Sequence, residues 1–529
     1  MAKFNTKKLQ TEKVQRKLVD NKAGGKAFKT SEAAELAGLA FTSFLKPKFY
    51  MSDNQVMNRI YQLMDKLPPK FSAQVAWKTR HIYGLRTVSH VMTAYLAKSG
   101  LTSGHSWAAK FYESMIVRPD DIQEIMALLE TKVKNEKGNN MKIKISHAMR
   151  KGFARAMKNF SEYQLAKYAK FSSGRGINLN DVVRYCHVPF DKETEPEFEK
   201  LMRRTLKNTD TWESMGNTAE TWLTLFKEEK YSYMSVLKNL RNIAKHNNSE
   251  LTDLAVEVVT KESNIKNSRT FPFEYLRAYQ ALNEYSRTNG NFQVSKLLKA
   301  VSKACDISLS NIPRLKGNTV IFLDQSGSMG NIRKESNLFA IALANACDAA
   351  ICIAFSSDAK YLNKINGNNN IIDTADTLSF MGGGTNFHAA FELAKKDKMV
   401  VDRVILITDD QHWMNSSGGY GYGYGNNSYK TSYETFLGWC SHVKMAHPEV
   451  WSIDMASYGT TQFPKDKVRV LYGFSEKIFD LMPDMEGDVN AFVDSINSVE
   501  FRTNKEIKSA RKITYEYNSE EDFDESSEE

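Results

Sequence analysis

The sequence predicts an α + α/β multidomain protein, in which a helical-repeat part precedes a mostly parallel sheet with helices on both faces. Three observations lead to this fold class. The chain has 529 residues, more than one hydrophobic core usually serves. Up to about residue 300, apolar residues recur mostly every three or four positions, as on helices that bury one face. Beyond that point short apolar runs alternate with helical patterns, which is typical of α/β folds.

Composition narrows the classes of protein further. Hydrophobic residues make up 42% and charged residues 25% of the chain, as in globular proteins. No apolar run approaches the roughly 18 residues of a membrane-spanning helix, and the charged start lacks the apolar core of a signal peptide. The five cysteines are scattered without zinc-type spacing, which fits a reducing compartment. We therefore expect a cytoplasmic protein without membrane contacts.

The net charge of +10 hides an asymmetry between the two parts of the chain. Residues 1–300 hold 50 Lys and Arg against 30 Asp and Glu, a net charge of +20, whereas residues 301–529 hold 22 against 32, a net charge of −10. Such an excess usually indicates a polyanionic partner, although a surplus that serves solubility alone is the plainer alternative. The basic part is thus the expected nucleic-acid-binding part.

The helical part is expected over residues 31–310. It follows a basic segment over residues 1–30, which we expect to form a flexible arm or an extended strap. Short polar turns join its helices, as in stacked helical hairpins. No repeat is strict enough to fix a period. The clearest predicted helices span residues 54–67, 121–133, 145–160, 161–171, 182–187, 235–246 and 273–285.

An α/β domain is expected over residues 311–500. Its predicted strands span residues 318–323, 351–356, 404–408 and 450–455, and its predicted helices span residues 335–350, 387–396 and 433–445. The final segment, residues 501–529, ends in a tail with seven acidic residues among the last twelve, which we expect to be disordered.

Oxygen-bearing side chains follow the first predicted strand of the α/β domain. Asp324, Ser326 and Ser328 alternate in one loop, and Gly327 lets the backbone turn sharply. Ligands of open α/β sheets bind at the carboxyl ends of the strands, where Thr385 and the pair Asp409-Asp410 also fall. Carboxylate and hydroxyl ligands favour Mg²⁺ or Mn²⁺.

In this order the residues match the DxSxS…T…D pattern of the metal-ion-dependent adhesion site (MIDAS), and this half of the chain resembles a von Willebrand factor A domain. The resemblance implies a cation held by Asp324, Ser326, Ser328, Thr385 and Asp409, with one position open for an acidic group of a partner. The plainer alternative is that these side chains only cap the next helix. The chain lacks the second carboxylate of an aspartyl-phosphate phosphatase, GxSxG and a P-loop, so we expect a binding metal and no enzyme.

The helical part interleaves positive charge with aromatic rings between residues 142 and 187. Lysine and arginine neutralise phosphates and aromatic rings stack on unpaired bases, so the mixture favours single-stranded RNA or DNA. Ordinary amphipathic helices with solvated faces are an equally good explanation of this segment alone. The interleaved residues are Lys142, Lys144, Arg150, Lys151, Arg155, Lys158, Tyr163, Lys167, Tyr168, Lys170, Arg175, Arg184, Tyr185 and His187.

Together the two halves resemble the Ro ribonucleoprotein autoantigens, the TROVE-domain proteins. The match covers about residues 31–490, and its most telling pieces are Lys167-Tyr168, DVVRYCH at 181–187, LKNL at 237–240 and the DQSGSM site. The resemblance implies a ring of HEAT-like helical repeats closed by a doubly wound A domain, within one chain and hence as a monomer. The turn at 171–178, the Gly/Tyr-rich loop at 418–425 and the acidic tail depart from the family pattern.

The resemblance also implies RNA partners. Small Y-type RNAs would bind the outer basic surface, and single-stranded 3′ ends of misfolded non-coding RNA would enter a basic central hole. Carried over residue by residue, Lys167, Arg184 and His187 would contact RNA at the hole, whereas Arg150 and Lys151 would lie on the outer surface. Lys170 belongs to the same expected RNA-binding set.

Three functions follow, in decreasing order of support. The first is a non-catalytic RNA-binding protein that acts in RNA quality control or as a scaffold, and that feeds aberrant RNA to a nuclease such as an exoribonuclease. The second is a metal-dependent protein-adhesion module whose helical part docks proteins. The third is a metal-dependent hydrolase, for which one metal site without a clear general base is poor support.

Overall fold

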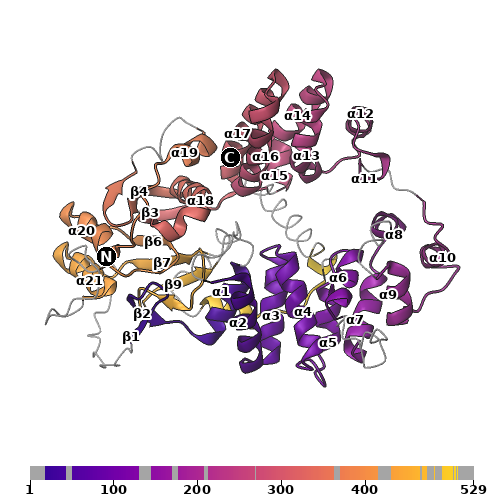
Figure 1. The fold of residues 1–529 in the computed structure, drawn as a ribbon, viewed down its shortest axis with the longest axis horizontal. Coiled ribbons are helices and arrows are strands. Elements are labelled where there is room, and N and C mark those ends of the chain that lie inside the picture. The colour runs from indigo at the N-terminus through magenta and orange to yellow at the C-terminus, as the bar shows by residue number, and fades with distance from the viewer. Residues whose placement is uncertain are drawn as a thin grey trace, which may run out of the picture.

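The computed structural model describes residues 18–42, 51–129, 145–169, 177–207, 212–268, 270–362, 370–414, 430–464, 467–472, 482, 491–503, 505–507 and 509. An array of helices forms an arc whose two ends meet a six-stranded sheet (Figure 1). The predicted fold class, helical repeats closed by an α/β domain, is confirmed. None of the described helices combines the length and the apolar character that crossing a membrane requires.

The helical array contains seventeen described helices, and each of the seven predicted ones coincides with one of them. Helices close in sequence pack on each other, as in the pairs α3 with α4, α5 with α7, and α16 with α17. The helices are α1 (Glu32–Phe41), α2 (Asp53–Lys66), α3 (Pro69–His81), α4 (Arg86–Lys98), α5 (Ala108–Ser114), α6 (Pro119–Leu129), α7 (His147–Met157), α8 (Glu162–Ala169), α9 (Leu179–Cys186), α10 (Pro196–Arg203), α11 (Trp212–Met215), α12 (Ala219–Lys227), α13 (Tyr233–Lys245), α14 (Ser249–Thr260), α15 (Glu262–Ser268), α16 (Pro272–Asn289) and α17 (Phe292–Ser308).

Local sequence signals explain where these helices begin. Ser52 caps α2, because its Oγ accepts the Gln55 N–H, and the Ser52 N–H in turn donates to Gln55 Oε1. Both N–H groups are thereby satisfied. Asn178 and Asp181 form the same reciprocal cap on α9. The apolar stripe of α2 is buried, as its spacing predicts, and consists of Val56, Ile60, Leu63 and Met64.

The sheet has the spatial order β5 (Ala359–Tyr361), β4 (Cys347–Phe355), β3 (Leu315–Asp324), β6 (Arg403–Thr408), β7 (Glu449–Asp454) and β9 (Arg469–Tyr472). All neighbouring strands are parallel except β5, which runs antiparallel to β4. Phe322 and Leu406 face a core shared with α20 (Phe387–Lys396) and α21 (Ser432–His442). Ile321 and Ile405 face the opposite core, which continues into the helical array through α18 (Arg333–Ala346).

One predicted helix of the α/β domain is too long. Residues 335–350 were expected to be helical, but α18 ends at Ala346 and β4 begins at Cys347. Ala349 and Ala350 favour helix by intrinsic propensity, yet they pair with Asn318 and Thr319 of β3. Pairing with β3 along the strand overrides that weak preference.

The second half of the predicted N-terminal arm is structured. Residues 1–30 were expected to form a flexible arm or an extended strap, whereas β1 (Leu18–Asp20) and β2 (Lys26–Lys29) form an antiparallel pair. Strand β2 also pairs with β8 (Thr460–Thr461) of the α/β domain. At the turn, a Cβ on Gly25 would lie only 1.9 Å from the His412 carbonyl oxygen, so glycine permits this close approach.

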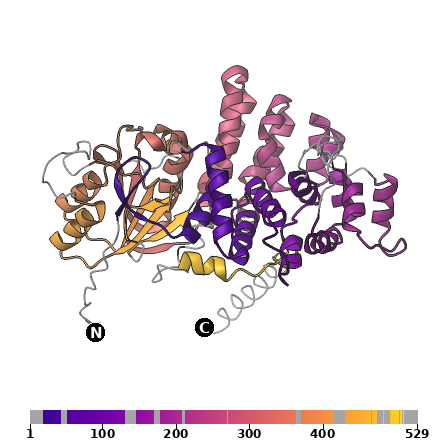
Figure 2. The same cartoon turned by 60° about the horizontal axis from the view of Figure 1, so that its bottom comes forward.

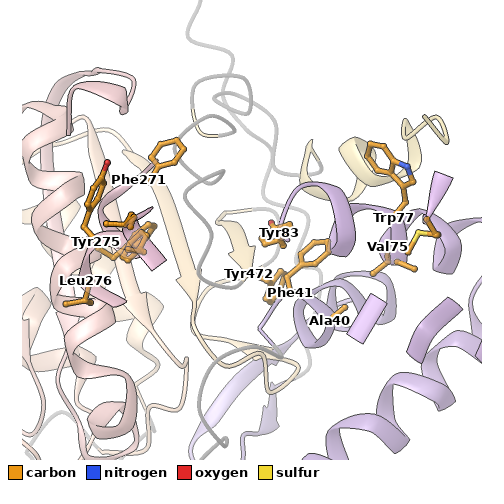
Figure 3. Packing of buried hydrophobic residues seen from close by; sticks show 14 of the residues in the cluster. Ala40, Phe41, Val75, Trp77, Tyr83, Phe271, Tyr275, Leu276 and Tyr472 are labelled. Atoms are coloured by element: carbon orange, nitrogen blue, oxygen red, sulfur yellow. The ribbon is translucent and has the colours of Figure 1, made fainter. Parts of the chain in front are cut away.

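Both ends of the helical arc pack on the α/β domain, which closes the ring. At one end Phe41 of α1 stacks on Tyr83 at 4.0 Å between ring centroids, beside Tyr472 of β9 (Figure 3). At the other end the Phe273 ring of α16 lies 5.8 Å from Phe339 of α18. Between α17 and α19 (Ile371–Thr377), the Ile371 N–H donates to Asp306 Oδ1 at 3.0 Å.

A C-terminal strap, residues 491–507, crosses from the α/β domain back to the helices (Figure 2). It begins with α23 (Ala491–Asn497), which packs on α3. Gln74 Nε2 donates to the Asn497 and Val499 carbonyls, and Trp77 Nε1 donates to the Arg502 carbonyl. The strap therefore ties the first helical hairpins to the sheet a second time.

Candidate metal site and nucleic-acid interface

A loop of oxygen donors follows β3 at the carboxyl edge of the sheet. Asp324, the last residue of β3, is fully buried, and the Ser326 N–H donates to its Oδ1 at 2.9 Å. Ser326 Oγ and Ser328 Oγ lie 3.3 Å apart. The chain then enters the short 3-10 helix η3 (Gly327–Ile332). One carboxylate and two hydroxyls of the predicted pattern thus lie in one tight loop.

The glycine-rich segment before Thr385 is bonded to this loop through its backbone. The Gly327 N–H donates to the Gly383 carbonyl at 2.9 Å, and the Gly382 N–H donates to the Gln325 carbonyl at 3.0 Å. Gly383 has φ of 83°, a conformation that side chains rarely tolerate. Thr385 itself is buried, and its carbonyl lies 2.9 Å from His412 Nδ1. The loop after β3 and the glycine-rich segment therefore form one connected unit. Thr385 was expected at the end of a strand, but its segment follows the helix α19.

Asp409 follows β6 and shares the electrostatic environment of Asp324. Burial, together with the charge of Asp324, raises the pKa of Asp409 to about 8, while a hydrogen bond from the Ser328 side chain works in the opposite direction. Burial also raises the pKa of Asp324, which the hydrogen bonds from Ser326 and Thr408 oppose. Two buried carboxylates that repel each other indicate a position at which positive charge would be stabilising.

Asp410, the other member of the sequence pair, faces a different part of the domain. Its backbone adopts φ of 56°. Ser452 Oγ of β7 donates to Asp410 Oδ2 at 2.9 Å, and Gln462 Nε2 donates to the Asp410 carbonyl at 2.9 Å. The structure thus separates Asp409, beside Asp324 and Ser328, from Asp410, beside β7.

The donor chemistry of the first group fits a hard divalent cation. Mg²⁺ prefers oxygen ligands, and its sites usually combine one or two carboxylates with other oxygens and water. Asp324 and Asp409 supply the carboxylates, and Ser326 and Ser328 supply hydroxyls that hydrogen-bond to them. Thr385 would add a third hydroxyl from the end of the glycine-rich segment that is bonded to this loop. Ser328 is the most exposed of the five donors, so it marks the side of the site that faces solvent.

Thr408 is a supporting residue that the sequence analysis missed. Its Oγ1 donates to Asp324 Oδ2 at 2.7 Å and accepts the Asp410 N–H at 3.0 Å. Thr408, at the end of β6, therefore orients the carboxylate of Asp324 at the end of the neighbouring strand β3. The sequence did contain a feature that could have pointed to this residue. Thr408 is the one polar residue of the predicted strand VILIT and directly precedes Asp409.

A cationic face runs along α7, which begins after its N-cap Ser146. Its residues recur every three or four positions, which places them on one side of a helix. On the other side Met149, Phe153 and Met157 are buried in the core of the array. We call this surface the α7 face, and it consists of His147, Arg150, Lys151, Ala154, Arg155 and Lys158.

The α7 face lines a pocket of about 340 Å³, which the end of α9 completes. Cys186, His187 and Pro189 form the second wall. His187 adopts the left-handed conformation, with φ of 49°, that ends α9 and turns the chain. Two carboxylates balance part of the charge, since Lys158 Nζ lies 3.1 Å from Glu195 and Arg155 lies 4.0 Å from Glu113. Arg150 Nε is buried without a hydrogen-bond partner among the described residues.

The structure groups the predicted RNA-binding residues differently from the sequence analysis. His187 was assigned to the central hole and Arg150 and Lys151 to the outer surface, but all three line this one pocket. Packing of α7 on α9 brings these segments together, although they lie more than 30 residues apart in the sequence. Arg184 is exposed on α9 outside the pocket lining, and Lys167 is half-buried on α8. Lys170, like the Gly/Tyr-rich loop and the acidic tail, lies outside the described residues.

A third group with metal-ligand chemistry, His90, Asp121 and Glu124, lies between α4 and α6. Although burial acts to raise it, the pKa of Asp121 is lowered by a hydrogen bond with His90 and by the charge of Arg80. Arg86 contacts Asp121 at 2.8 Å and Glu124 at 3.1 Å. These arginines occupy the positions next to the carboxylates, so the group is an ion-pair network that joins neighbouring helices.

Comparisons with known proteins agree with this architecture. Residues 199–361 match the model of the TROVE domain family. The crystal structure of the Deinococcus radiodurans RO (RSR) protein matches 88% of this chain and 100% of its own, with a TM-score of 0.53 and 14% sequence identity. A search of curated protein sequences finds no significant match. The resemblance to the TROVE-domain proteins that the sequence motifs indicate is thus confirmed by the family match and by the shared fold.

Proposed function

Since the chain carries a TROVE domain within the fold of a Ro protein, we propose that it is an RNA-binding ribonucleoprotein component. Its ligands are small non-coding RNA of the Y type and the single-stranded 3′ ends of misfolded non-coding RNA. It acts in RNA quality control or as a scaffold, and hands aberrant RNA to a partner such as an exoribonuclease. It does so as a monomeric ring in the cytoplasm and without catalysing a reaction itself.

The observation that carries this proposal is the α7 face. Four basic side chains line one pocket, and only two carboxylates, Glu113 and Glu195, pair with them among the described residues. Arginine and lysine side chains so arranged release counterions from a nucleic-acid backbone when they bind it. Tyr185, which precedes the pocket residues of α9, is 41% exposed and is therefore free to stack on an unpaired base.

The proposal is tested by binding of the full chain to a short RNA duplex with and without a single-stranded 3′ extension, at about 50 and about 200 mM salt. We expect the extension to raise affinity, and we expect binding to weaken by orders of magnitude over that salt range. His187→Ala should lower the affinity for RNA, and Lys167→Ala reports whether α8 contributes to recognition of the extension. Equal affinity for blunt duplex and extended RNA would exclude recognition of 3′ ends.

We further propose that the donors at the carboxyl edge of the sheet hold Mg²⁺ or Mn²⁺ as a MIDAS. Asp324, Ser326, Ser328, Thr385 and Asp409 are the ligands, directly or through water. The cation supplies a Lewis acid with an open position, to which an acidic side chain of a protein partner binds. Calorimetric titration of the protein with Mg²⁺ tests the site, and Asp324→Ala should abolish the binding without changing the affinity for RNA.

A metal-dependent adhesion module remains the second candidate function, and the connected loops at Asp324 and Gly383 favour it. In that case the helical array docks proteins. The two candidates differ in RNA binding, because the adhesion module predicts negligible RNA affinity at physiological salt. It also predicts loss of partner capture in Asp324→Ala. The protein would be a nuclease only if the purified protein degrades RNA and the Asp409→Ala variant does not.

A further inference from the structure

The end of the chain and the α7 face carry opposite charge. Residues 516–529 contain eight acidic residues and no basic residue. The α7 face contributes Arg150, Lys151, Arg155 and Lys158 to one pocket, with His147 and His187 beside them. Guanidinium groups bind carboxylates in the same forked geometry in which they bind phosphates. An acidic peptide is therefore a chemical substitute for the backbone of RNA on this surface.

The described part of the chain ends beside α5. Phe501 of the strap packs between Trp107 and Phe111, at 5.6 Å and 5.2 Å between ring centroids. A few residues later Lys110 Nζ contacts Glu506 Oε1 at 2.8 Å. These contacts anchor the strap on α5, and the acidic residues follow from that anchor.

A line of charged groups leads from this anchor to the α7 face. Lys110, which holds Glu506, lies 3.9 Å from Glu113, and Glu113 lies 4.0 Å from Arg155 of the α7 face. The two helices are in close contact, because a Cβ on Gly152 of α7 would lie 2.5 Å from the Ala109 carbonyl oxygen of α5. Helices packed in this way have axes about 8 Å apart.

The length of the remaining chain suffices to reach this surface. Asp522, in the middle of the acidic segment, follows Ser509, the last described residue, by thirteen positions. An extended chain of that length spans about 45 Å, several times the distance between the two helices. Tethering at such a distance supplies an effective concentration in the millimolar range, so weak electrostatic binding is enough for substantial occupancy.

We propose that residues 516–529 bind the α7 face of their own chain and compete with RNA for it. The inference rests on the proposed function, because competition matters only where RNA uses the same surface. While the tail occupies the α7 face, it lowers the affinity of that face for short, non-specific polyanions. RNA that makes further contacts around the ring binds strongly enough to displace the tail. The tail thereby raises the selectivity of the α7 face at a cost in affinity.

The test compares the full chain with a variant of equal length in which the eight acidic residues of 516–529 are replaced by Gln or Asn. We expect the affinity for a short single-stranded RNA to rise about 3- to 10-fold at about 50 mM salt, and the gain to shrink at about 200 mM. A fluorescent peptide of residues 510–529 should bind the neutralised-tail protein in trans. Lys151→Ala with Arg155→Ala should abolish that binding.

The two proposals fail in distinguishable ways. If tail neutralisation leaves RNA affinity unchanged while Lys151→Ala with Arg155→Ala lowers it, competition by the tail is excluded and RNA binding by the α7 face stands. If tail neutralisation gives the same gain in the protein that already lacks Lys151 and Arg155, the effect is long-range repulsion of RNA, and docking on the α7 face is excluded. If the α7 variant keeps full RNA affinity, the proposed use of this face by RNA fails.

Discussion

The MIDAS-like site and the α7 face are built in opposite ways. The first collects oxygen donors from loops after two strands and from the glycine-rich segment, and four of its five donors are at most 2% exposed. The second draws most of its charge from one helix, and its cations Lys151, Arg155 and Lys158 are exposed. Backbone hydrogen bonds hold the loops together, whereas packing of the opposite side of α7 holds the charged face.

This contrast determines how each site responds to substitution. In the proposed complex with RNA, the exposed cations of the α7 face make separate contacts with a long ligand, so the effects of their removal should nearly add. The loop donors share partners, as Thr408 does with Asp324 and Asp410, so removal of one group should disturb the others. We make four predictions, beginning with the largest expected effect. Three of them test this difference between the loop site and the α7 face, and one concerns the contact of the strap with α3.

Removal of three charges from the α7 face should produce the largest loss. We expect the variant with Lys151→Ala, Arg155→Ala and Lys158→Ala to bind single-stranded RNA about 100-fold more weakly at low salt. The slope of log affinity against log salt should fall by about 2, because each lost phosphate contact contributes about 0.7. Fluorescence titrations at four salt concentrations measure both quantities.

A matched control removes the same charge from the α/β domain. Lys316, Lys396 and Lys444 are exposed there, and replacement of these three by Ala should change RNA affinity less than about 3-fold, through long-range electrostatics alone. An equal loss in both triple variants would mean that net charge and not the α7 face governs binding. Unchanged melting temperatures are expected in both, since the side chains are exposed.

Replacement of Thr408 by Val tests the shared character of the loop site. The change removes the hydrogen bond to Asp324 Oδ2 and leaves that buried oxygen without its donor. We expect Mg²⁺ to bind about 10- to 100-fold more weakly, which is typical of lost partners of metal ligands. Thr408→Ser keeps the hydroxyl and should restore most of the affinity. Calorimetry with Mg²⁺ decides, and equal affinities for the Val and Ser variants would contradict the orienting role.

The two sites also differ in how far the sequence predicted them. The donors of the MIDAS-like site form a pattern with fixed order, and Asp324 and Asp409 directly follow recognisable apolar strands, so the amino-acid sequence alone reveals them. The spacing of the cations on α7 is equally visible between residues 147 and 158. The pairing of that face with His187 is not, because it depends on how α9 packs against α7.

Long-range pairing explains the other differences from the sequence prediction. Residues 26–29, Lys-Ala-Phe-Lys, are too short a run to predict a strand, yet they form one that pairs with Thr460 and Thr461, more than 400 residues away. Ala349 and Ala350 become extended because β3 lies beside them. In both cases the local sequence does not determine the conformation, and contacts that no local pattern reveals decide the outcome.

The third prediction concerns Lys78, through which α3 contacts the strap and which should make the stability of the protein depend on pH. Lys78 of α3 is buried, its Nζ donates to Ser495 Oγ at 2.8 Å, and burial lowers its pKa to about 8. An unfolded lysine keeps its proton up to about pH 10.4, so stability should rise between about pH 8 and 10.4, where only the folded state has lost it. Lys78→Met should raise the free energy of unfolding at pH 7 by about 1 to 2 kcal/mol, after allowance for the lost hydrogen bond. Denaturant titrations at pH 7 and 10 measure both effects, and a Met variant less stable at pH 7 would show that the hydrogen bond outweighs desolvation.

The smallest expected effect concerns the N-cap of α7. Ser146 Oγ accepts the Met149 N–H at 3.1 Å, so Ser146→Ala should cost about 1 kcal/mol of stability. RNA affinity should stay within about 2-fold, because burial of Phe153 and the contact of Gly152 with α5 hold the helix in place whether or not it is capped. Ser146→Asp, an equally good cap, should restore stability in thermal melts. A large loss of RNA affinity in Ser146→Ala, rescued by Ser146→Asp, would show that the α7 face depends on its local turn as strongly as the MIDAS-like site depends on its loops.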